Sequence, residues 1–353
     1  MQLDPAKSYL LSRPRGGFND AMVQLEKSCR YAEKFGRVLL LDMSRSGLRM
    51  QIDELFDLQG GPGRNVVLWH DDMAPELDRA ASVFPDALCH RISTYETVWQ
   101  QDAIGFADSE SGQLISFDHT CDHDAQVLVY EQAGGGYTSL NALRRLGPLR
   151  ADVAAEIVAR LVPLGRGYDA VHLRHSDYET DFVSYLRELR PVLRGRRVLI
   201  CSDSRAAKDA AADILHNSTT VLSVSDIPDL GGQPLHRTAY GDDRAANIDV
   251  LCDLLAMALA DTLFFTRLSG GNDNGVKYSG FSLLADLLGR NRDVVGQLLA
   301  NADPKARETI LARSPARGLI HRLRCGLHVW RHPRAYAKRV RRNRRANRAT
   351  AQP

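Results

Sequence analysis

Short apolar runs alternate with longer amphipathic stretches along most of the chain. In the first half, residues 20–35 carry an apolar side chain at every third or fourth position, which predicts an amphipathic helix that Gly36 ends. Apolar runs predict buried strands at 38–41, 66–69 and 127–130. Residues 100–125 are polar and weakly periodic, which predicts a loop or a short hairpin.

The second half alternates more regularly between strand and helix patterns. Strands are predicted at 168–173, 197–201, 219–224 and 262–266, and helices at 149–161, 180–193, 205–215, 245–260 and 281–289. This order is typical of right-handed β-α-β units around a parallel sheet, so an α/β fold is expected. The 353 residues suffice for two domains, expected at 1–150 and 151–300, followed by a helical extension and basic tail at 301–353.

Composition narrows the class of protein. The chain is 44% apolar and 25% charged, as soluble globular proteins are, and no apolar run reaches the roughly 18 residues of a membrane-spanning helix. The first residues lack a basic segment followed by a long apolar core, so no signal peptide is expected. The six cysteines include no CxxC pair, which disfavours a disulfide framework and favours a cytoplasmic location.

Positive charge is concentrated near the C-terminus. Residues 322–348 contain 11 Lys or Arg and no acidic residue; subtracting these 11 from the 46 basic residues leaves 35 against 43 acidic ones, about −8 for the remainder. Apolar residues interrupt the basic segment, a pattern that suits peripheral binding to an anionic membrane on its inner face. A solvated tail is the alternative, and the acidic remainder disfavours nucleic-acid binding.

Polar residues follow three strands predicted in the second half. The carboxyl ends of parallel strands share one sheet edge, where ligands of open α/β sheets bind. We therefore expect a ligand site among Arg174 and Asp177, then Ser202, Asp203 and Ser204, and finally Ser269–Asn274 with Ser279, Gly280, Phe281 and Ser282.

The first of these groups has two interpretations. His172 and Arg174 are two residues apart, so they face the same side of the predicted strand. The guanidinium can clamp a phosphate through two hydrogen bonds. Alternatively, it forms an ion pair with Asp177 or Asp181, a few residues away.

The other two groups also have structural alternatives. Asp203 can accept hydrogen bonds from a base or a ribose, or it can cap the helix that follows. Residues 279–282, with Lys277 nearby, offer hydroxyls and free backbone N–H groups at a helix start, which suits an anion but also describes ordinary capping.

The segment RPRGGFND, residues 13–20, offers a comparable site before the first predicted helix. Gly16 and Gly17 let the backbone approach a ligand closely, and Asn19 or Asp20 can cap the helix. The spacing is not GxGxxG, so a dinucleotide fingerprint is absent, and paired glycines also precede helices that bind nothing.

One segment of the sequence contains residue types that could bind a metal ion. DHTCDHD, residues 118–124, places His119 and His123 four positions apart, but a polar loop without a second ligand cluster favours no metal site. The chain has no HExxH, GxSxG or GxxxxGK[ST] segment, and no DxD flanked by apolar residues.

Four ordered segments carry a family resemblance. RGGFND, VHLRHSDYETD, VLICSDS and DLLAMALADTLFF followed by SGFSLLA resemble the nodulation-type α1,6-fucosyltransferases and the related protein O-fucosyltransferases, over residues 8–290. The resemblance implies a GT-B-like fold, with two Rossmann-type domains facing a cleft. It also implies an inverting glycosyltransferase without metal or cofactor, which moves a sugar, expected to be fucose, from a GDP-sugar to a glycan or lipid-linked acceptor.

The same resemblance assigns roles to the polar edge residues. Arg174 would bind the β-phosphate of GDP-fucose, and Asp203 would meet the guanine or ribose. The implied donor-binding set is Gly16, Gly17, Phe18, Asn19, His172, Arg174, Asp177, Ser202, Asp203, Ser279, Gly280, Phe281 and Ser282. His175 and Ser176 stand where many relatives have a second Arg or an Ile-Gly pair, which leaves the donor sugar open.

Catalysis would rest on stabilising the departing diphosphate. Arg174 and the helix that starts near Ser279 supply the positive charge that a metal-free transferase needs. Asp20 and Glu131 are both candidates for the general base, and leaving-group stabilisation without a base is a third option. A non-catalytic nucleotide-sugar-binding or glycan-binding protein of the same fold is the alternative function.

Overall fold

A computed structural model describes residue 4 and residues 6–58, 65–178, 180–235, 237–268 and 278–312. The chain forms two compact units. Unit 1 comprises Met1–Ala159, Gln233–Leu251 and Asn291–Arg307, and unit 2 comprises Arg160–Gly232, Cys252–Arg290 and Glu308–Pro353. The domains expected from the sequence were contiguous, whereas unit 1 takes in two later segments. The basic tail and the loop 269–277 lie outside the described residues.

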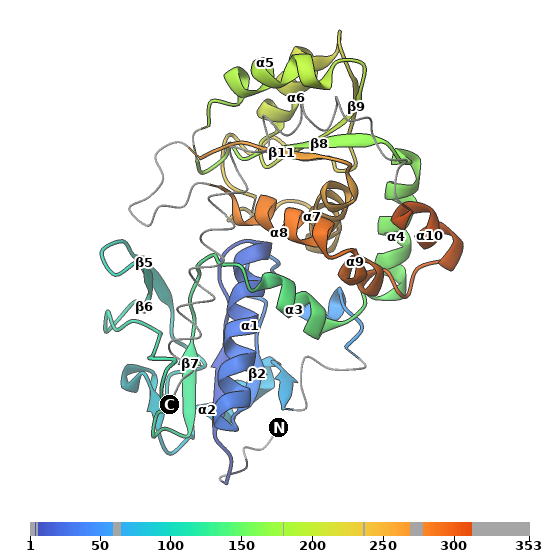
Figure 1. Ribbon diagram of the computed structural model, residues 1–353. Coiled ribbons are helices and arrows are strands. Elements are labelled where there is room, and N and C mark those ends of the chain that lie inside the picture. Colours follow the sequence, from blue (N-terminus) through green and yellow to red (C-terminus); the bar gives the residue numbers. More distant parts are fainter. Residues whose placement is uncertain are drawn as a thin grey trace. The chain divides into compact units, whose positions relative to one another are not determined.

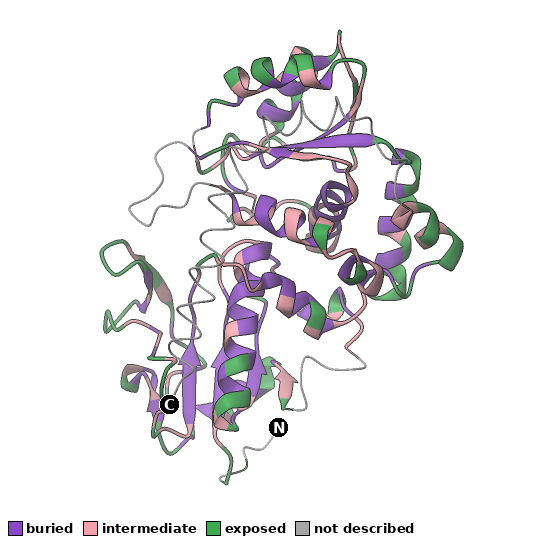
Figure 2. Cartoon of the chain, in the orientation of Figure 1, coloured by how far each residue is buried: buried purple, intermediate pink, exposed green. Residues whose placement is uncertain are grey.

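Unit 1 contains a parallel sheet of short, largely buried strands. Its order is β3-β2-β1-β7-β4, with β1 (Tyr9–Ser12), β2 (Val38–Leu41), β3 (Val66–Leu68), β4 (Val83–Phe84) and β7 (Val127–Tyr130). The two central strands are buried at every position, as expected for a parallel sheet covered on both faces (Figure 2).

Helix α1 (Phe18–Phe35) covers one face of this sheet. It begins after Gly17 and ends at Gly36, whose φ of 68° is the left-handed conformation that terminates helices. A hydrogen bond between the Ser12 and Ser28 hydroxyls (2.7 Å) joins the helix to β1, and the Tyr130 hydroxyl of β7 donates to Gln24 Oε1 (2.7 Å). Helix α3 (Ser139–Leu146) packs against α1, and α9 (Arg292–Leu298) packs against α3.

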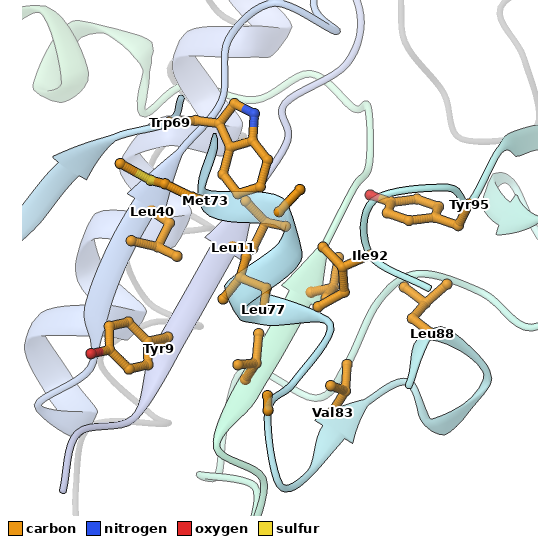
Figure 3. Packing of buried hydrophobic residues seen from close by; sticks show 14 of the residues in the cluster. Tyr9, Leu11, Leu40, Trp69, Met73, Leu77, Val83, Leu88, Ile92 and Tyr95 are labelled. Carbon is orange, nitrogen blue, oxygen red and sulfur yellow. The ribbon is translucent and has the colours of Figure 1, made fainter. Parts of the chain in front are cut away.

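A hydrophobic cluster covers the opposite face of the sheet. Figure 3 shows side chains from β1, β2 and β4 meeting those of helix α2 (Ala74–Leu77) and of the loops around it. Tyr95 lies in this cluster and is 2% exposed. The cluster therefore fixes the position of the Tyr95 hydroxyl, which takes part in the candidate site described below.

The remaining elements are divided between the two units. The polar stretch predicted as a loop or short hairpin contains an antiparallel hairpin, β5 (Thr97–Gln100) and β6 (Gly105–Asp108). Helix α4 (Ala151–Leu161) follows the sheet, and α10 (Pro304–Leu311) ends the described chain. Short 3-10 turns occur at Ile52–Glu54, Asp71–Met73, Asp86–Leu88 and Val162–Leu164.

Unit 2 contains a second parallel sheet, of order β10-β9-β8-β11. Its strands are β8 (Tyr168–Leu173), β9 (Arg197–Ser202), β10 (Thr220–Leu222) and β11 (Leu263–Phe265). Helices α5 (Phe182–Leu193), α6 (Arg205–Leu215) and α8 (Gly280–Arg290) belong to this unit, and α7 (Asp243–Leu259) contributes its second half (Figure 1). The expected α/β class with parallel sheets is confirmed.

Alternate residues of β8 face opposite sides of the second sheet. Val171 and Leu173 pack with the apolar faces of α5 and α6. On the other side, the Tyr168 hydroxyl donates to the Ala256 carbonyl of α7 at 2.7 Å. His172 shares the Tyr168 side, which the period of two along a strand requires. None of the described helices is long and apolar enough to cross a membrane.

Candidate functional site

The carboxyl ends of β8 and β11 form the candidate site of unit 2. The strand order reverses between them, which makes this edge the topological switch point where open α/β sheets bind ligands. Arg174 follows β8 and Thr266 follows β11. The backbone N–H of Arg174 donates to Thr266 Oγ1 at 3.2 Å, and the N–H of Thr266 donates to the His172 carbonyl at 3.1 Å. The two segments therefore meet at this edge, which we call the β8 edge.

Arg174 is held by two carboxylates at the β8 edge. Its Nη2 lies 2.6 Å from Asp177 and its Nη1 lies 2.8 Å from Asp203, with 18% of its side chain exposed. The ion pair with Asp177 is one of the alternatives that the sequence left open. Asp181, the other proposed partner, instead caps α5 by accepting the Ser184 N–H at 3.1 Å. Arg174 is thus pre-positioned, and partly open to solvent.

Asp203 organises the turn that carries Arg174. Its carboxylate accepts the backbone N–H of His175 at 2.8 Å and the hydroxyl of Ser176, in addition to the Arg174 ion pair. Burial alone would raise the pKa of Asp203, but the Arg174 charge and the Ser176 and His175 hydrogen bonds outweigh it and lower that pKa. Protein donors therefore occupy this carboxylate, and the expected contact with a base or ribose stays a prediction.

His172 joins the β8 edge to the first turn of α8. Its Nδ1 lies 2.6 Å from the Ser282 hydroxyl, and its ring centroid lies 5.6 Å from that of Phe281. Burial lowers the pKa of His172 to about 4; the charge of Asp203 opposes this effect and that of Arg174 adds to it. The imidazole is therefore neutral near pH 7. It anchors the start of α8 beside the strand that leads to Arg174.

The predicted serine residues serve mainly to hold this edge together. The Ser202 hydroxyl donates to the Leu173 carbonyl at 2.8 Å and accepts the Ser204 N–H at 3.1 Å. The Ser279 carbonyl accepts the Leu283 N–H at 3.1 Å, and Gly280 is the first residue of α8. The Ser282 hydroxyl is engaged by His172, as described above. The backbone N–H groups of the α8 start therefore remain the part suited to an anion.

Unit 1 has its own switch point, between β1 and β7. Gly17 is the N-cap residue of α1, and no side chain caps the start of this helix with a hydrogen bond. Gly16 has a φ of 86°, and a Cβ there would meet the Asp20 Cβ at 2.9 Å, so the sequence needs glycine at this position. Phe18 and Asn19 are buried, and Asn19 accepts a hydrogen bond from Ser139 at 2.9 Å. Asp20 lies in the first turn of α1 and is partly exposed.

Glu131, directly after β7, is the centre of a buried ion-pair network. It is fully buried, and its carboxylate is bound by Arg15 (2.6 Å), Arg45 (3.0 Å) and the Tyr95 hydroxyl (2.6 Å). Burial, followed by the charge of Glu131, raises the pKa of Tyr95. Two guanidinium groups neutralise this carboxylate, so the geometry assigns Glu131 a structural role more readily than that of a base.

Arg13, the first residue of the predicted segment 13–20, received no role from the sequence, and it is buried beside this network. Its Nε donates to Asp42 at 3.0 Å, and its guanidinium lies over the rings of Trp69 (4.8 Å) and Tyr95 (5.2 Å). The local sequence RPR is typical of a polar loop and does not indicate that Arg13 is buried. The only signal for buried ion-pair partners of the arginines is that two acidic residues, Asp42 and Glu131, directly follow predicted strands. Their pairing depends on strand order, which the sequence pattern leaves open.

The histidine-rich loop at 118–124 makes other contacts. His119 stacks on Phe117 with ring centroids 4.5 Å apart, and Asp122 pairs with Arg37 at 2.8 Å. Burial lowers the pKa of His119 to about 4. Across the described ranges, no group of three His, Cys, Asp or Glu side chains is arranged to hold a metal ion.

Comparison with known proteins yields a structural likeness. No protein-family model and no curated protein matches the sequence. The structure of NodZ α-1,6-fucosyltransferase co-crystallised with GDP aligns at a TM-score of 0.50 and 18% identity, over 80% of this chain and 92% of that chain. The same enzyme soaked with GDP-fucose aligns at 0.50 and 19%, with the same coverage.

Another structure has a slightly lower score: the fucosyltransferase NodZ from Bradyrhizobium aligns at a TM-score of 0.49 and 20% identity, over 80% of this chain and 93% of that chain. At 18% and 19% identity, the two alignments with a TM-score of 0.50 show a likeness of fold alone. It agrees with the expected α/β class and with the two parallel sheets described above. The arrangement of two domains around a cleft, which the sequence segments implied, stays a prediction.

Proposed function

We propose that this protein is an inverting, metal-independent glycosyltransferase that moves fucose from GDP-fucose to a hydroxyl group of a glycan. We also propose the GT-B arrangement, in which the two units face a cleft. The fold shared with NodZ α-1,6-fucosyltransferase, whose structures were obtained with GDP and after soaking with GDP-fucose, supports both proposals. The ordered sequence segments that resemble this group point to the same reaction.

The arrangement around Arg174 is the observation that carries the proposal. Breaking the bond between fucose and the nucleotide leaves negative charge on a diphosphate, and preorganised cations and helix N-termini stabilise such charge. At the β8 edge, Arg174 follows the strand whose His172 is hydrogen-bonded to Ser282 in the first turn of α8. A guanidinium and the positive end of an 11-residue helix thus belong to one rigid assembly.

The ion pairs of Arg174 suggest how a donor would bind. Asp203 also holds the backbone of His175, so this carboxylate is committed to the turn. Asp177 makes a local ion pair three residues along the chain, at the end of the same segment. We propose that the diphosphate takes the place of the Asp177 carboxylate at Nη2, while Asp203 keeps the guanidinium in position.

We propose Asp20 rather than Glu131 as the general base. A base must reach the acceptor hydroxyl within hydrogen-bonding distance. Glu131 is fully buried and bound by two arginines, whereas Asp20 lies in the first turn of α1, beside Gly16 and Gly135. Asp20→Asn is therefore expected to lower turnover with little change in the affinity for GDP.

The test measures GDP release from GDP-fucose by wild type and by Arg174→Ala. Loss of a charge-stabilising group costs on the order of a hundredfold to a thousandfold in rate, which is the expected effect. Arg187→Ala, which changes an exposed arginine of α5, is the matched control and should retain full activity. Equal turnover by wild type and Arg174→Ala would refute the proposed role.

The same assay separates the alternative function. A non-catalytic sensor of this fold would bind GDP but release none from GDP-fucose, whatever acceptor is supplied. Turnover that persists in excess EDTA would agree with metal independence, and turnover that requires added Mg²⁺ or Mn²⁺ would contradict it. A thermal-shift comparison of GDP, UDP and ADP tests the nucleotide, because a ligand specific to the folded state raises the melting temperature.

A further inference from the structure

Exposed apolar side chains concentrate on the β5–β6 hairpin of unit 1. In the described part of the chain four large apolar side chains are exposed, and three belong to this hairpin: Val98 (46%), Trp99 (43%) and Ile104 (57%). The turn between the strands, residues 101–104, is exposed throughout (Figure 2). A cluster of this kind on an otherwise polar surface marks a binding site more often than isolated apolar residues do.

The hairpin is anchored at the carboxyl edge of the unit 1 sheet. Gln132, two residues after β7, accepts the Phe106 N–H at 2.9 Å and donates to the Phe106 carbonyl at 2.8 Å. Arg15, three residues after β1, donates to Thr97 at 2.6 Å and lies 4.9 Å from the centre of the Phe106 ring. The hairpin is thus fixed beside the β1–β7 switch point, where a ligand of unit 1 is expected.

One face of the hairpin carries an aromatic pair. Trp99 and Phe106 are directly opposite each other on neighbouring strands, and their ring centroids lie 5.2 Å apart in an edge-on arrangement. Thr97 shares this face because side chains alternate along a strand, whereas Val98 faces the opposite way. Arg15, Phe106 and Trp99 therefore form a row that runs from the sheet edge to the exposed indole.

The chemistry of this row suits a neutral sugar. A pyranose ring has apolar C–H faces and a rim of hydroxyls, so it packs on an aromatic ring while polar neighbours bind its edge. Next to Trp99, Gln101 accepts the indole N–H through its Oε1 at 3.1 Å, and the exposed carboxylate of Asp102 in the turn can bind such hydroxyls. The exposed turn of the hairpin, residues 101–104, carries one acidic side chain, Asp102, and no Lys or Arg, which disfavours anionic lipids and nucleic acids as occupants.

We propose that Trp99 and Phe106 form a platform that binds a neutral sugar ring of the glycan acceptor. This inference rests on the proposed function for the role of the glycan as acceptor. The platform itself is a carbohydrate-binding site and can be tested without any transfer reaction.

The experiment titrates the full chain with cellotetraose, chitotetraose and maltotetraose in the absence of a GDP-sugar, and follows binding by calorimetry. Saturable binding of at least one tetrasaccharide is expected. Trp99→Ala should weaken it about tenfold, because the stacked ring is lost. Val98→Thr, on the opposite face of the same hairpin, should bind within about twofold of wild type. Trp99→Phe should recover part of the loss.

Three outcomes would overturn the inference. These are no binding of any tetrasaccharide by the wild type, equal binding by Trp99→Ala, or equal loss in Trp99→Ala and Val98→Thr. Circular dichroism melting of each variant shows whether it is folded. If Trp99→Ala is not folded, the sugar affinity of Trp99→Phe relative to wild type tests the inference instead. Calorimetry of the wild type with GDP is run separately. Sugar binding without GDP binding would refute the proposed function but not the platform. GDP binding without sugar binding would refute the platform but not the proposed function.

Discussion

His172 couples the stability of the fold to pH. Burial lowers the pKa of His172 to about 4, from an ordinary 6.5 that applies in the unfolded chain. Between these two values the unfolded state binds a proton that the folded state does not, so the free energy of unfolding falls as the pH decreases through this window. The loss contributed by His172 is on the order of 3 kcal/mol at most.

His172→Gln should therefore flatten the pH dependence of stability between about pH 6.5 and pH 4. The measurement is urea unfolding at several pH values for wild type and variant. His119, in the other unit, also has a pKa lowered to about 4 by burial and provides an independent second case. His119→Gln should remove a separate share of the slope, and the two effects should add because the residues share no partner. An unchanged slope in His172→Gln would contradict the neutral, buried imidazole.

Asp177 competes with the proposed diphosphate for Arg174. Because the two side chains are each 18% exposed and lie 2.6 Å apart, replacing Asp177 by Asn should free the guanidinium and tighten GDP binding by about threefold to tenfold. Asp181→Asn is the control: it removes a nearby carboxylate charge without touching Arg174, and its Oδ1 can still accept the Ser184 N–H that caps α5, so stability should change little. Calorimetry with GDP decides, and weaker binding by Asp177→Asn would show that this carboxylate contributes to the site.

The candidate site was predictable wherever its residues are neighbours in sequence. The spacing of His172, Arg174 and Asp177 left two interpretations open. The structure has the ion pair between Arg174 and Asp177, and the phosphate clamp stays a prediction. The second partner, Asp203, comes from the next strand, and its three simultaneous hydrogen-bonding contacts cannot be read from a local pattern. Glu131 was placed correctly at a strand end, but its burial between two arginines depends on the order of the strands.

At the scale of the elements, a glycine of α8, Gly289, allows this helix to pack closely against α7. A Cβ at Gly289 would lie 2.9 Å from the Ala258 carbonyl oxygen of α7, which is a backbone atom with little freedom to move. Gly289→Ala should lower the free energy of unfolding by about 1–3 kcal/mol through overpacking, although alanine is the better helix former. Because α8 carries Ser282 at its other end, the same change should also weaken GDP binding.

Urea denaturation and calorimetry test this expectation together. Arg290→Ala, the next residue on α8, removes an exposed side chain that pairs with Asp286 and should change stability by less than about 0.5 kcal/mol. A Gly289→Ala variant as stable as wild type would mean that the two helices can separate at no cost.

Elements with strong apolar patterns were predicted to within a residue or two. Strands 38–41, 127–130 and 168–173 match the structure, and helix 20–35 starts only two residues earlier. The central strand β1 was missed, because its four residues are followed at once by the polar segment RPRGG. Helix α3 was also missed, since its eight residues offer only two turns of periodicity.

At the scale of the whole molecule, both units share one topological plan. The first three strands of each lie in reverse order, followed across the switch point by a strand from later in the chain. Of the selected residues that the structure describes, residues 16–20 and Glu131 follow β1 and β7 at the switch point of unit 1. In unit 2, Arg174 and Asp177 follow β8 at the switch point, and Asp203 follows the neighbouring strand β9. Sequence alternation predicted parallel sheets but not this order, which long-range contacts determine.

The whole chain also has an asymmetric charge, since the 11 basic residues between 322 and 348 offset an acidic remainder. Each Lys or Arg near an anionic bilayer contributes about 1 kcal/mol to binding. The full chain should therefore sediment with phosphatidylserine vesicles and not with phosphatidylcholine vesicles, and added salt should weaken this binding because it screens the charges. A chain ending at residue 312 should lose vesicle binding by on the order of a hundredfold and retain its affinity for GDP. Equal sedimentation of both chains would place the membrane contact elsewhere. If the full chain fails to sediment, the tail is a solvated segment and the proposed membrane association is wrong.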